Sequence, residues 1–245
     1  MMSRIWPIAL SVVTDSLRRK VVYVVLVFAA ILAMAIPALP SYGLGIEDAV
    51  YREVALALSF VTALVLALSL AANRVPSEVD RRTVYNVLAK GVSRAEYLVG
   101  SWLGVFLVTG GAVAAFTVVQ QVIAVTRYGD PMWQLWQGAL AIWLEMGVLC
   151  AFAVAISSVV GPVVVVTAAM AVLFAGHSRS TLVGGEGALA LRPFYPSLDT
   201  FNIVNPVAHG SGVPALYVLS MLVVFAGFVA VALAVAVLLF GRRDL

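Results

Sequence analysis

Long apolar runs separated by short polar segments dominate the pattern of residues along this chain. Six of these runs reach or approach the length of about 20 apolar residues that a helix needs to cross a bilayer, with about 17 tolerated. The pattern therefore predicts an all-α integral membrane protein with six transmembrane helices. The predicted spans are residues 21–36, 54–72, 98–125, 133–156, 163–176 and 215–240.

Residues 3–20 show a different pattern, in which apolar and polar positions alternate with a helical period. One face carries Ile5, Ile8, Ala9, Val12, Val13 and Ser16, and Ser11, Asp15, Arg18 and Arg19 are turned largely away from it. Such a stripe is typical of an amphipathic helix at a membrane surface, so we predict an interfacial helix. The alternative is a cytoplasmic lead-in to the first span. A short apolar part broken by Pro7 argues against a cleaved signal peptide.

The three longest polar segments between the predicted spans are residues 41–53, 73–97 and 177–214. Residues 41–53 are expected to form the first outer loop. Residues 177–214 are rich in glycine and proline, which predicts a long outer loop with at most short helical or re-entrant pieces. Residues 73–97 form the only long charged segment between two predicted spans.

The charged segment 73–97 carries signals for two short helices with a break. Ser77 precedes Asp80 by three positions, and Ser93 precedes Glu96 by three, as in an N-cap followed by an acidic residue. Gly91 suits the end of a helix. A helix, a break and a second helix outside the membrane would give a soluble partner a rigid shape to hold.

Basic residues are distributed unequally between the two sides of the predicted topology. Arg52, Arg127, Arg179 and Arg192 lie on one side, which leaves eleven of the fifteen Lys and Arg on the side of the termini and residues 73–97. The positive-inside rule therefore predicts that both termini and this segment are cytoplasmic. Tyr128, Trp133 and Trp136 would then form an aromatic belt at the outer surface.

Composition supports the membrane class and narrows the chemistry. The chain is 63% hydrophobic and 11% charged, against about 25% charged residues in an average soluble domain. Residues 1–245 are predicted to form a single transmembrane domain, and the net charge of +3 is not interpreted as nucleic-acid binding. One cysteine, Cys150, excludes a disulfide framework. With two histidines, His177 and His209, a metal site is not expected, and ordinary loop hydrogen bonding is the preferred interpretation.

The chain lacks the loop with which ATP-driven transporters hold phosphate. That loop has the pattern GxxxxGK[ST], whereas the two lysines, Lys20 and Lys90, are followed by Val21 and Gly91. If ATP and magnesium are involved, another subunit must bind them, and no cofactor is predicted for this chain.

The sequence EVDRRTVYNVLAKGVSRAEYLVGSWLG at residues 78–104 resembles the cytoplasmic segment of type-2 ATP-binding-cassette (ABC) transporter permeases. The runs PSLDTFN at 196–202, VAHG at 207–210 and GRRDL at 241–245 are similar to the branch called multi-copper-enzyme-maturation permeases. The chain departs from the family at Gly91, where proline is frequent, and at Ser101, where lysine is common.

This resemblance implies a permease with six spans per chain, working as a homodimer or heterodimer in the plasma (inner) membrane of a prokaryote with two cytoplasmic ABC ATPase subunits. Residues 78–89 would form the coupling helix that docks into the ATPase. Charge pairs would orient docking and apolar side chains would anchor it. The orienting residues are Glu78, Asp80, Arg81 and Arg82, and the anchoring residues are Val84, Tyr85 and Leu88. The alternative is that these charges only solvate a loop and fix the topology.

Glu145 is the one carboxylate deep within a predicted span, twelve residues after Trp133 or about 18 Å along the helix. An intramembrane carboxylate marks a pathway, a proton relay or a subunit interface. The alternative is a glutamate that ties helices together through Thr109, Thr117, Gln120 or Gln121. Gly100 and Gly104 form a GxxxG pair, for which close packing within the chain is preferred to dimerisation.

These observations favour a non-catalytic permease subunit that exports a hydrophobic or amphipathic substrate, with membrane lipids and a second permease chain as further partners. A membrane anchor or assembly factor without transport is the first alternative. An intramembrane hydrolase or lipid-modifying enzyme is the second. It would need clustered Ser, His and Asp or paired carboxylates at membrane depth, where the sequence offers Glu145.

Overall fold

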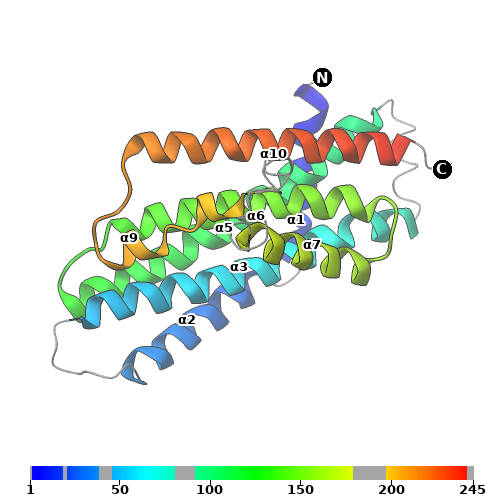
Figure 1. The fold of residues 1–245 in the computed structure, drawn as a ribbon. Coiled ribbons are helices and arrows are strands. Elements are labelled where there is room, and N and C mark those ends of the chain that lie inside the picture. The colour runs from blue at the N-terminus through cyan, green and yellow to red at the C-terminus, as the bar shows by residue number, and fades with distance from the viewer. Residues whose placement is uncertain (1, 19–20, 39–45, 81–91, 179–196, 242–245) are drawn as a thin grey trace.

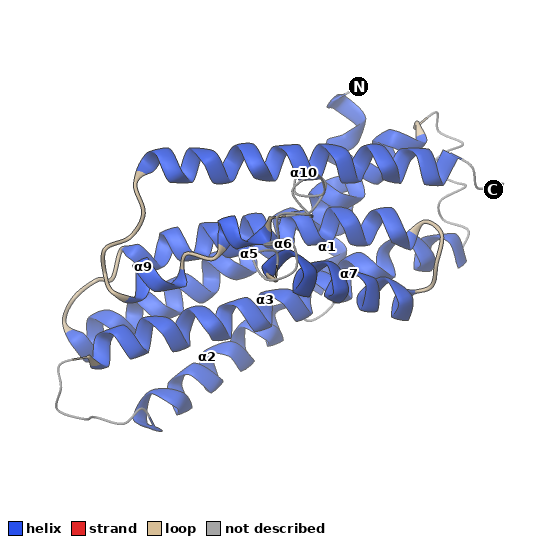
Figure 2. Cartoon of the chain, viewed as in Figure 1, coloured by secondary structure: helices blue, strands red, loops and turns tan. Residues whose placement is uncertain are grey.

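The computed structural model describes residues 2–18, 21–38, 46–80, 92–178 and 197–241, which fold into helices without a strand (Figure 2). The prediction of an all-α protein is confirmed for this part of the chain. The elements are α1 (Met2–Arg18), α2 (Val21–Ala38), α3 (Glu47–Asp80), α5 (Arg94–Tyr128), α6 (Gln134–Ser157), α7 (Pro162–His177), the 3₁₀ helix η2 (Leu198–Phe201), α9 (Val204–Ala208) and α10 (Ala215–Gly241).

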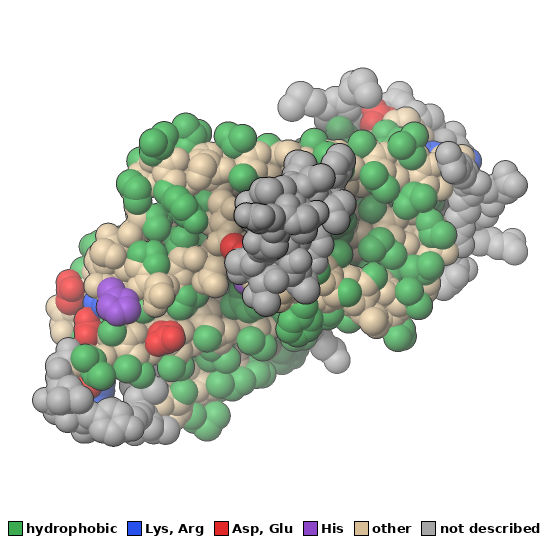
Figure 3. Space-filling model, in the orientation of Figure 1, with side chains coloured by type: hydrophobic (Ala, Val, Ile, Leu, Met, Phe, Trp, Pro, Cys, Tyr) green, Lys and Arg blue, Asp and Glu red, His purple; other side chains and the backbone are tan. Residues whose placement is uncertain are grey.

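Four of the described helices have the length and apolar composition to cross a membrane. They are Glu47–Arg74 within α3, and the whole of α5, α6 and α10. Three shorter apolar helices accompany them, at Ile5–Ser16, Tyr23–Ala35 and Pro162–His177. On the face shown in Figure 3, hydrophobic side chains are spread along the described surface, and the coloured charged side chains lie mostly toward the two ends of the molecule. These features are those of a membrane-embedded helical protein.

Helix α6 lies at the centre of the bundle and packs against α3, α5, α7 and α10 (Figure 1). It runs antiparallel to α5, because the indole N–H of Trp102 donates to the carbonyl of Gly147 and that of Trp143 donates to the carbonyl of Phe106, both at 2.9 Å. Helix α5 begins at one end of the bundle, the Arg94 end, and stops at the other, the Tyr128 end.

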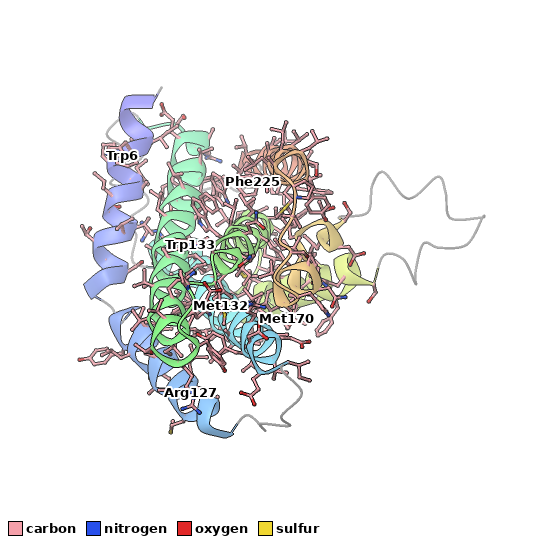
Figure 4. The ribbon with its side chains drawn as sticks, turned by 90° about the vertical axis from the view of Figure 1, so that its left-hand side faces the viewer. Trp6, Arg127, Met132, Trp133, Met170 and Phe225 are labelled. Atoms are coloured by element: carbon pink, nitrogen blue, oxygen red, sulfur yellow. The ribbon has the colours of Figure 1, made fainter. Side chains whose placement is uncertain are left out.

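Four aromatic side chains join α5, α6 and α10. Phe106 stacks on Trp143 with 4.4 Å between ring centroids, and it also stacks on Trp102 and Phe225 at 5.3 Å. Figure 4 labels Phe225, which α10 directs toward these rings. Gly147 makes room for them, since a Cβ at this position would collide with Phe106 and Phe225. Each such ring pair adds about 0.5–1.5 kcal/mol beyond its buried area.

Arg94 fastens the first turn of α5 to the last turn of α10. One guanidinium nitrogen donates to the carbonyls of Phe240 at 2.8 Å and Gly241 at 3.1 Å. The same guanidinium lies over the Phe240 ring, 5.7 Å from its centroid. The last carbonyls of a helix have no partner within it and carry partial negative charge, so a cation here both satisfies and neutralises them.

The start of α5 confirms one predicted cap. The Ser93 side chain accepts from the Glu96 backbone N–H, and the Glu96 carboxylate accepts from the Ser93 backbone N–H at 2.9 Å. The second predicted N-cap, Ser77, is wrong because that residue lies inside α3. Extending a formed helix through Pro76 costs less than nucleating a new one.

The predicted outer loop at residues 41–53 is also too long, since α3 already begins at Glu47. Glu47 and Asp48 provide negative charge in the first turn, where the helix dipole favours it. Asp48 also pairs with Arg52 one turn later, at 2.8 Å. The first turns of this helix are therefore polar, which hides them from a search for apolar runs.

Helix α1 lies along the first turns of α5, at one edge of the molecule (Figure 4). The two helices run parallel, because Gly100 faces Ile8 and Gly104 faces Val12. The predicted apolar stripe is the packed face, with Ala9, Val12 and Ser16 buried. Packing of the GxxxG pair within the chain is thus confirmed. The apolar stripe has a protein partner, and a location of α1 at the membrane surface stays a prediction.

We expect Gly104→Ala to destabilise the protein by about 1–3 kcal/mol, the usual cost of overpacking a filled contact. The added Cβ would meet the Val12 side chain and the Ala9 carbonyl. Thermal unfolding of the purified protein in detergent measures the effect. Gly111→Ala is the matched control, because a Cβ at Gly111 meets no atom within 4 Å. Equal unfolding temperatures for the two variants would contradict the packing of α1 on α5.

Candidate functional site at the end of helix α7

Helix α7 ends near the middle of the bundle and does not reach its far end. It begins at the Arg94 end, after the turn that follows α6, and its 16 residues span about 24 Å. Its last residue, His177, lies beside Glu145, the twelfth of the 24 residues of α6. Gly176 makes room for η2, since a Cβ there would collide with Leu198.

After α7, the described chain resumes at residue 197 as η2 and α9 and leads to the Tyr128 end (Figure 1). There Arg52 of α3 donates to the carbonyl of Ala208 at 2.9 Å. Gln134, the first residue of α6, donates to the carbonyl of Gly210 at 2.8 Å. The predicted short helical pieces within residues 177–214 are present. Helix α7 ends at His177, within one residue of the predicted loop start, and the location of residues 177–214 outside the membrane stays a prediction.

Glu145 is 2% exposed and projects from α6 toward α3 and α7. Helical periodicity explains this direction. Trp143 and Gly147 share the face that contacts α5, and a residue midway between them in sequence points to the opposite side at 100° per residue. Gly138, two turns before Glu145, packs against Leu56 of α3.

The four polar residues of α5 that were expected to bond to Glu145 bond elsewhere, so these partners are wrong. Thr109 and Thr117 donate to carbonyls of their own helix, at Val105 and Val113. Gln120 donates to the Ala55 carbonyl and to the Ser59 hydroxyl of α3, and Gln121 donates to the Met132 carbonyl. All four lie on a helix that Glu145 does not face.

His177 faces Glu145 with an unprotonated nitrogen when its ring is neutral. Its Nδ1 lies 3.2 Å from the carbonyl of Leu173, and a carbonyl only accepts, so Nδ1 carries the proton. Nε2 then holds a lone pair, 3.6 Å from Oε1 of Glu145. That separation exceeds hydrogen-bonding distance. The Glu145 Oε1 atom is buried without a hydrogen-bond partner among the described residues.

A cavity of about 250 Å³ opens beside these two side chains. Its buried floor is formed by Leu56, Ile142, Glu145 and Phe201. Ala57, Val61 and Asn202 also line it and are exposed, so they mark its mouth. Phe60, which packs edge-on against the His177 ring at 6.3 Å, and Val204 complete the wall.

Groups that can contribute negative potential lie near this cavity. The Glu145 carboxyl lies there, and Asp199 of η2 is close enough to interact with it electrostatically. The C-terminus of α7 adds the partial negative charge of its last carbonyls. In membrane proteins, helices that end at mid-depth place this charge where cations bind. The arrangement can therefore hold a cation or a strong hydrogen-bond donor.

The predicted docking residues are not brought to this site. Glu78 and Asp80 belong to the last turn of α3, and the other five lie outside the described residues. Those five are Arg81, Arg82, Val84, Tyr85 and Leu88.

His209 stays at the Tyr128 end, where its Nδ1 contacts the Asn205 carbonyl at 2.9 Å, so ordinary loop bonding is confirmed for it. Cys150 is fully buried. Within the described ranges, no three His, Cys, Asp or Glu side chains gather in a way that could hold a metal ion.

The proximity of His177 to Glu145 and the position of Asn202 at the mouth of the cavity were missed from the sequence. One signal was available, because a predicted span of 14 residues between 163 and 176 falls short of the usual 17 to 20. A helix that stops early leaves its last residue inside the bundle. Comparison with protein-family models found no match to this chain, and comparison with curated proteins found none either.

We expect Asn202→Cys to react with a small water-soluble maleimide, because this position lies at the mouth of the cavity. The native Cys150 should stay unlabelled in the folded protein, since it is fully buried and a thiol without water access does not react. Mass spectrometry of both proteins gives the extent of labelling. Labelling of Cys150 in the parent protein as fast as of the new cysteine would contradict the closed packing of α6.

Proposed function

We propose that this chain is the transmembrane permease subunit of an ATP-driven ABC exporter, in which separate cytoplasmic ATPase subunits hydrolyse ATP. The resemblance of residues 78–104 to type-2 permeases supports the proposal, as does the absence of a phosphate-binding loop from the sequence. The observation that carries it is the position of the charged segment. Helix α3 leads into this segment directly from the wall of the cavity, and α5 leads out of it.

Helix α3 offers a direct mechanical connection between a docked ATPase and the cavity. It is continuous from Glu47 to Asp80, and Leu56 and Phe60 on its inner part line the cavity. From Phe60 to Asp80 the distance is about 30 Å along the helix. Because packed helices shift as rigid elements, a displacement of Asp80 by the ATPase would move the wall that carries Phe60.

The other side of the docking segment is equally well anchored. The capping box of Ser93 and Glu96 fixes the start of α5, and Arg94 joins that start to the end of α10. A partner that binds residues 78–89 would thus act on α3, α5 and α10 together. A loop that only fixes topology needs none of these connections.

The proposed topology has six crossings, with both termini in the cytoplasm of a prokaryote and the protein in its inner membrane. In this scheme α7, η2 and α9 together make the fifth crossing, because they lead from the Arg94 end to the Tyr128 end. A second permease chain would complete the transporter. The outer face of α10 leaves large apolar side chains for that chain or for lipid, among them Leu216, Leu219, Val223, Val231 and Leu238.

Reversing the charges of Arg81 and Arg82 together with Tyr85→Ala should abolish co-purification of the ATPase that the wild-type chain retains from native membranes. The substitutions remove the orienting charges and one apolar anchor of the proposed coupling helix. Immunoblotting of the membrane fraction checks that insertion is unchanged. Charge reversal at Arg242 and Arg243 is the matched control, and it should leave ATPase binding intact.

Retention of the ATPase by the triple variant would contradict docking at this segment. Loss of the ATPase in the control as well would show that the effect is only one of net charge. If the wild-type chain retains no ATPase, the permease proposal fails, and a membrane anchor or assembly factor takes its place.

A further inference from the structure

We infer that the cavity between Glu145 and His177 binds a primary ammonium group carried on a compact apolar body. Only the further step of calling this amine the exported cargo rests on the proposed function. The binding itself is a property of the folded chain and needs no ATPase.

When Glu145 is ionised and the His177 ring is neutral, the two polar atoms that face each other beside the cavity are both acceptors. Oε1 of Glu145 is buried without a hydrogen-bond partner among the described residues. Nε2 of His177 then presents a lone pair, because Nδ1 donates its proton to the Leu173 carbonyl. These atoms lie 3.6 Å apart, so a nitrogen placed between them can donate to both at about 2.8 Å. A primary ammonium has three N–H donors, which leaves one for Asn202 at the mouth.

The electrostatics select a cation over a neutral donor. An ionised carboxylate buried in apolar surroundings is costly unless it is paired with a cation. Asp199 and the last carbonyls of α7 add negative potential at the same place. A positively charged ligand would lower the electrostatic energy of all three groups, which are the Glu145 carboxylate, Asp199 and the last carbonyls of α7. An alcohol of the same shape supplies only a hydrogen bond.

The walls define the rest of the ligand. Leu56, Phe60, Ile142 and Val204 are apolar and surround the space above the two acceptors. The volume of about 250 Å³ accommodates a ring or a short branched chain. A metal ion is a poorer fit, because the described residues bring one carboxylate and one imidazole here and a bound metal needs more ligands.

Equilibrium dialysis of radiolabelled phenethylamine against the purified full-length chain in detergent tests the inference, with protein-free micelles subtracted. We expect saturable binding to the wild-type chain. Glu145→Gln should weaken it at least about tenfold, the usual cost of removing a charged partner. His177→Phe should weaken it by about threefold to tenfold, since the ring contact to Phe60 is kept and one acceptor is lost. Glu53→Gln is the matched control, an exposed carboxylate near the Tyr128 end, and it should bind like wild type.

Two competitors test the chemistry on the wild-type chain, so the result does not depend on whether a variant folds. Unlabelled phenethylamine should displace the probe, while its N,N,N-trimethyl derivative and 2-phenylethanol should displace it at least about tenfold less well. Equal competition by either compound would overturn the inference, as would unchanged binding to Glu145→Gln or the absence of saturable binding to wild type. Amine binding without a co-purified ATPase would leave this site intact and defeat only the exporter proposal.

Discussion

A carboxyl group buried at the centre of an apolar helix bundle is the constraint on which the rest of this structure depends. Glu145 has no hydrogen-bond partner on α5, and its Oε1 atom has none elsewhere in the described chain. The bundle is open on this side because α7 stops at His177 and the chain continues to the Tyr128 end as η2 and α9. Non-helical backbone at membrane depth is tolerated where it lines a cavity, and a cavity lies there.

The face of α6 opposite Glu145 contacts α5 and α10. Stacked rings, two indole hydrogen bonds and a glycine at position 147 join it closely to α5 and α10. Around Phe106, α5, α6 and α10 are thus joined by ring contacts, whereas on the other side of α6 the helices α3 and α7 line the cavity beside Glu145. Movement of α3 relative to α6 would change that cavity, and α3 is the helix that extends into the charged segment 73–97.

Much of the fold could be predicted from the sequence, because apolar runs, the Ser93 capping box and the amphipathic stripe of α1 are local signals. The centre of the bundle could not. The direction of Glu145 depends on which face of α6 meets α5, and its neighbour His177 comes from a different helix, α7, that ends beside the middle of α6. The charged first turn of α3 at Glu47 and its continuation past Pro76 were not predicted, because both are polar extensions of the apolar part of this helix.

Cross-linking of cysteine pairs tests the central claim, that α7 ends beside the middle of α6. In a Cys150→Ala background, His177→Cys is combined either with Glu145→Cys or with Gln134→Cys, positions that lie about 16 Å apart along α6. The structure predicts rapid cross-linking of the Glu145 pair by a short thiol reagent and little reaction of the Gln134 pair. Preferential cross-linking to position 134 would mean that α7 crosses the whole bundle, and it would contradict the account of the cavity.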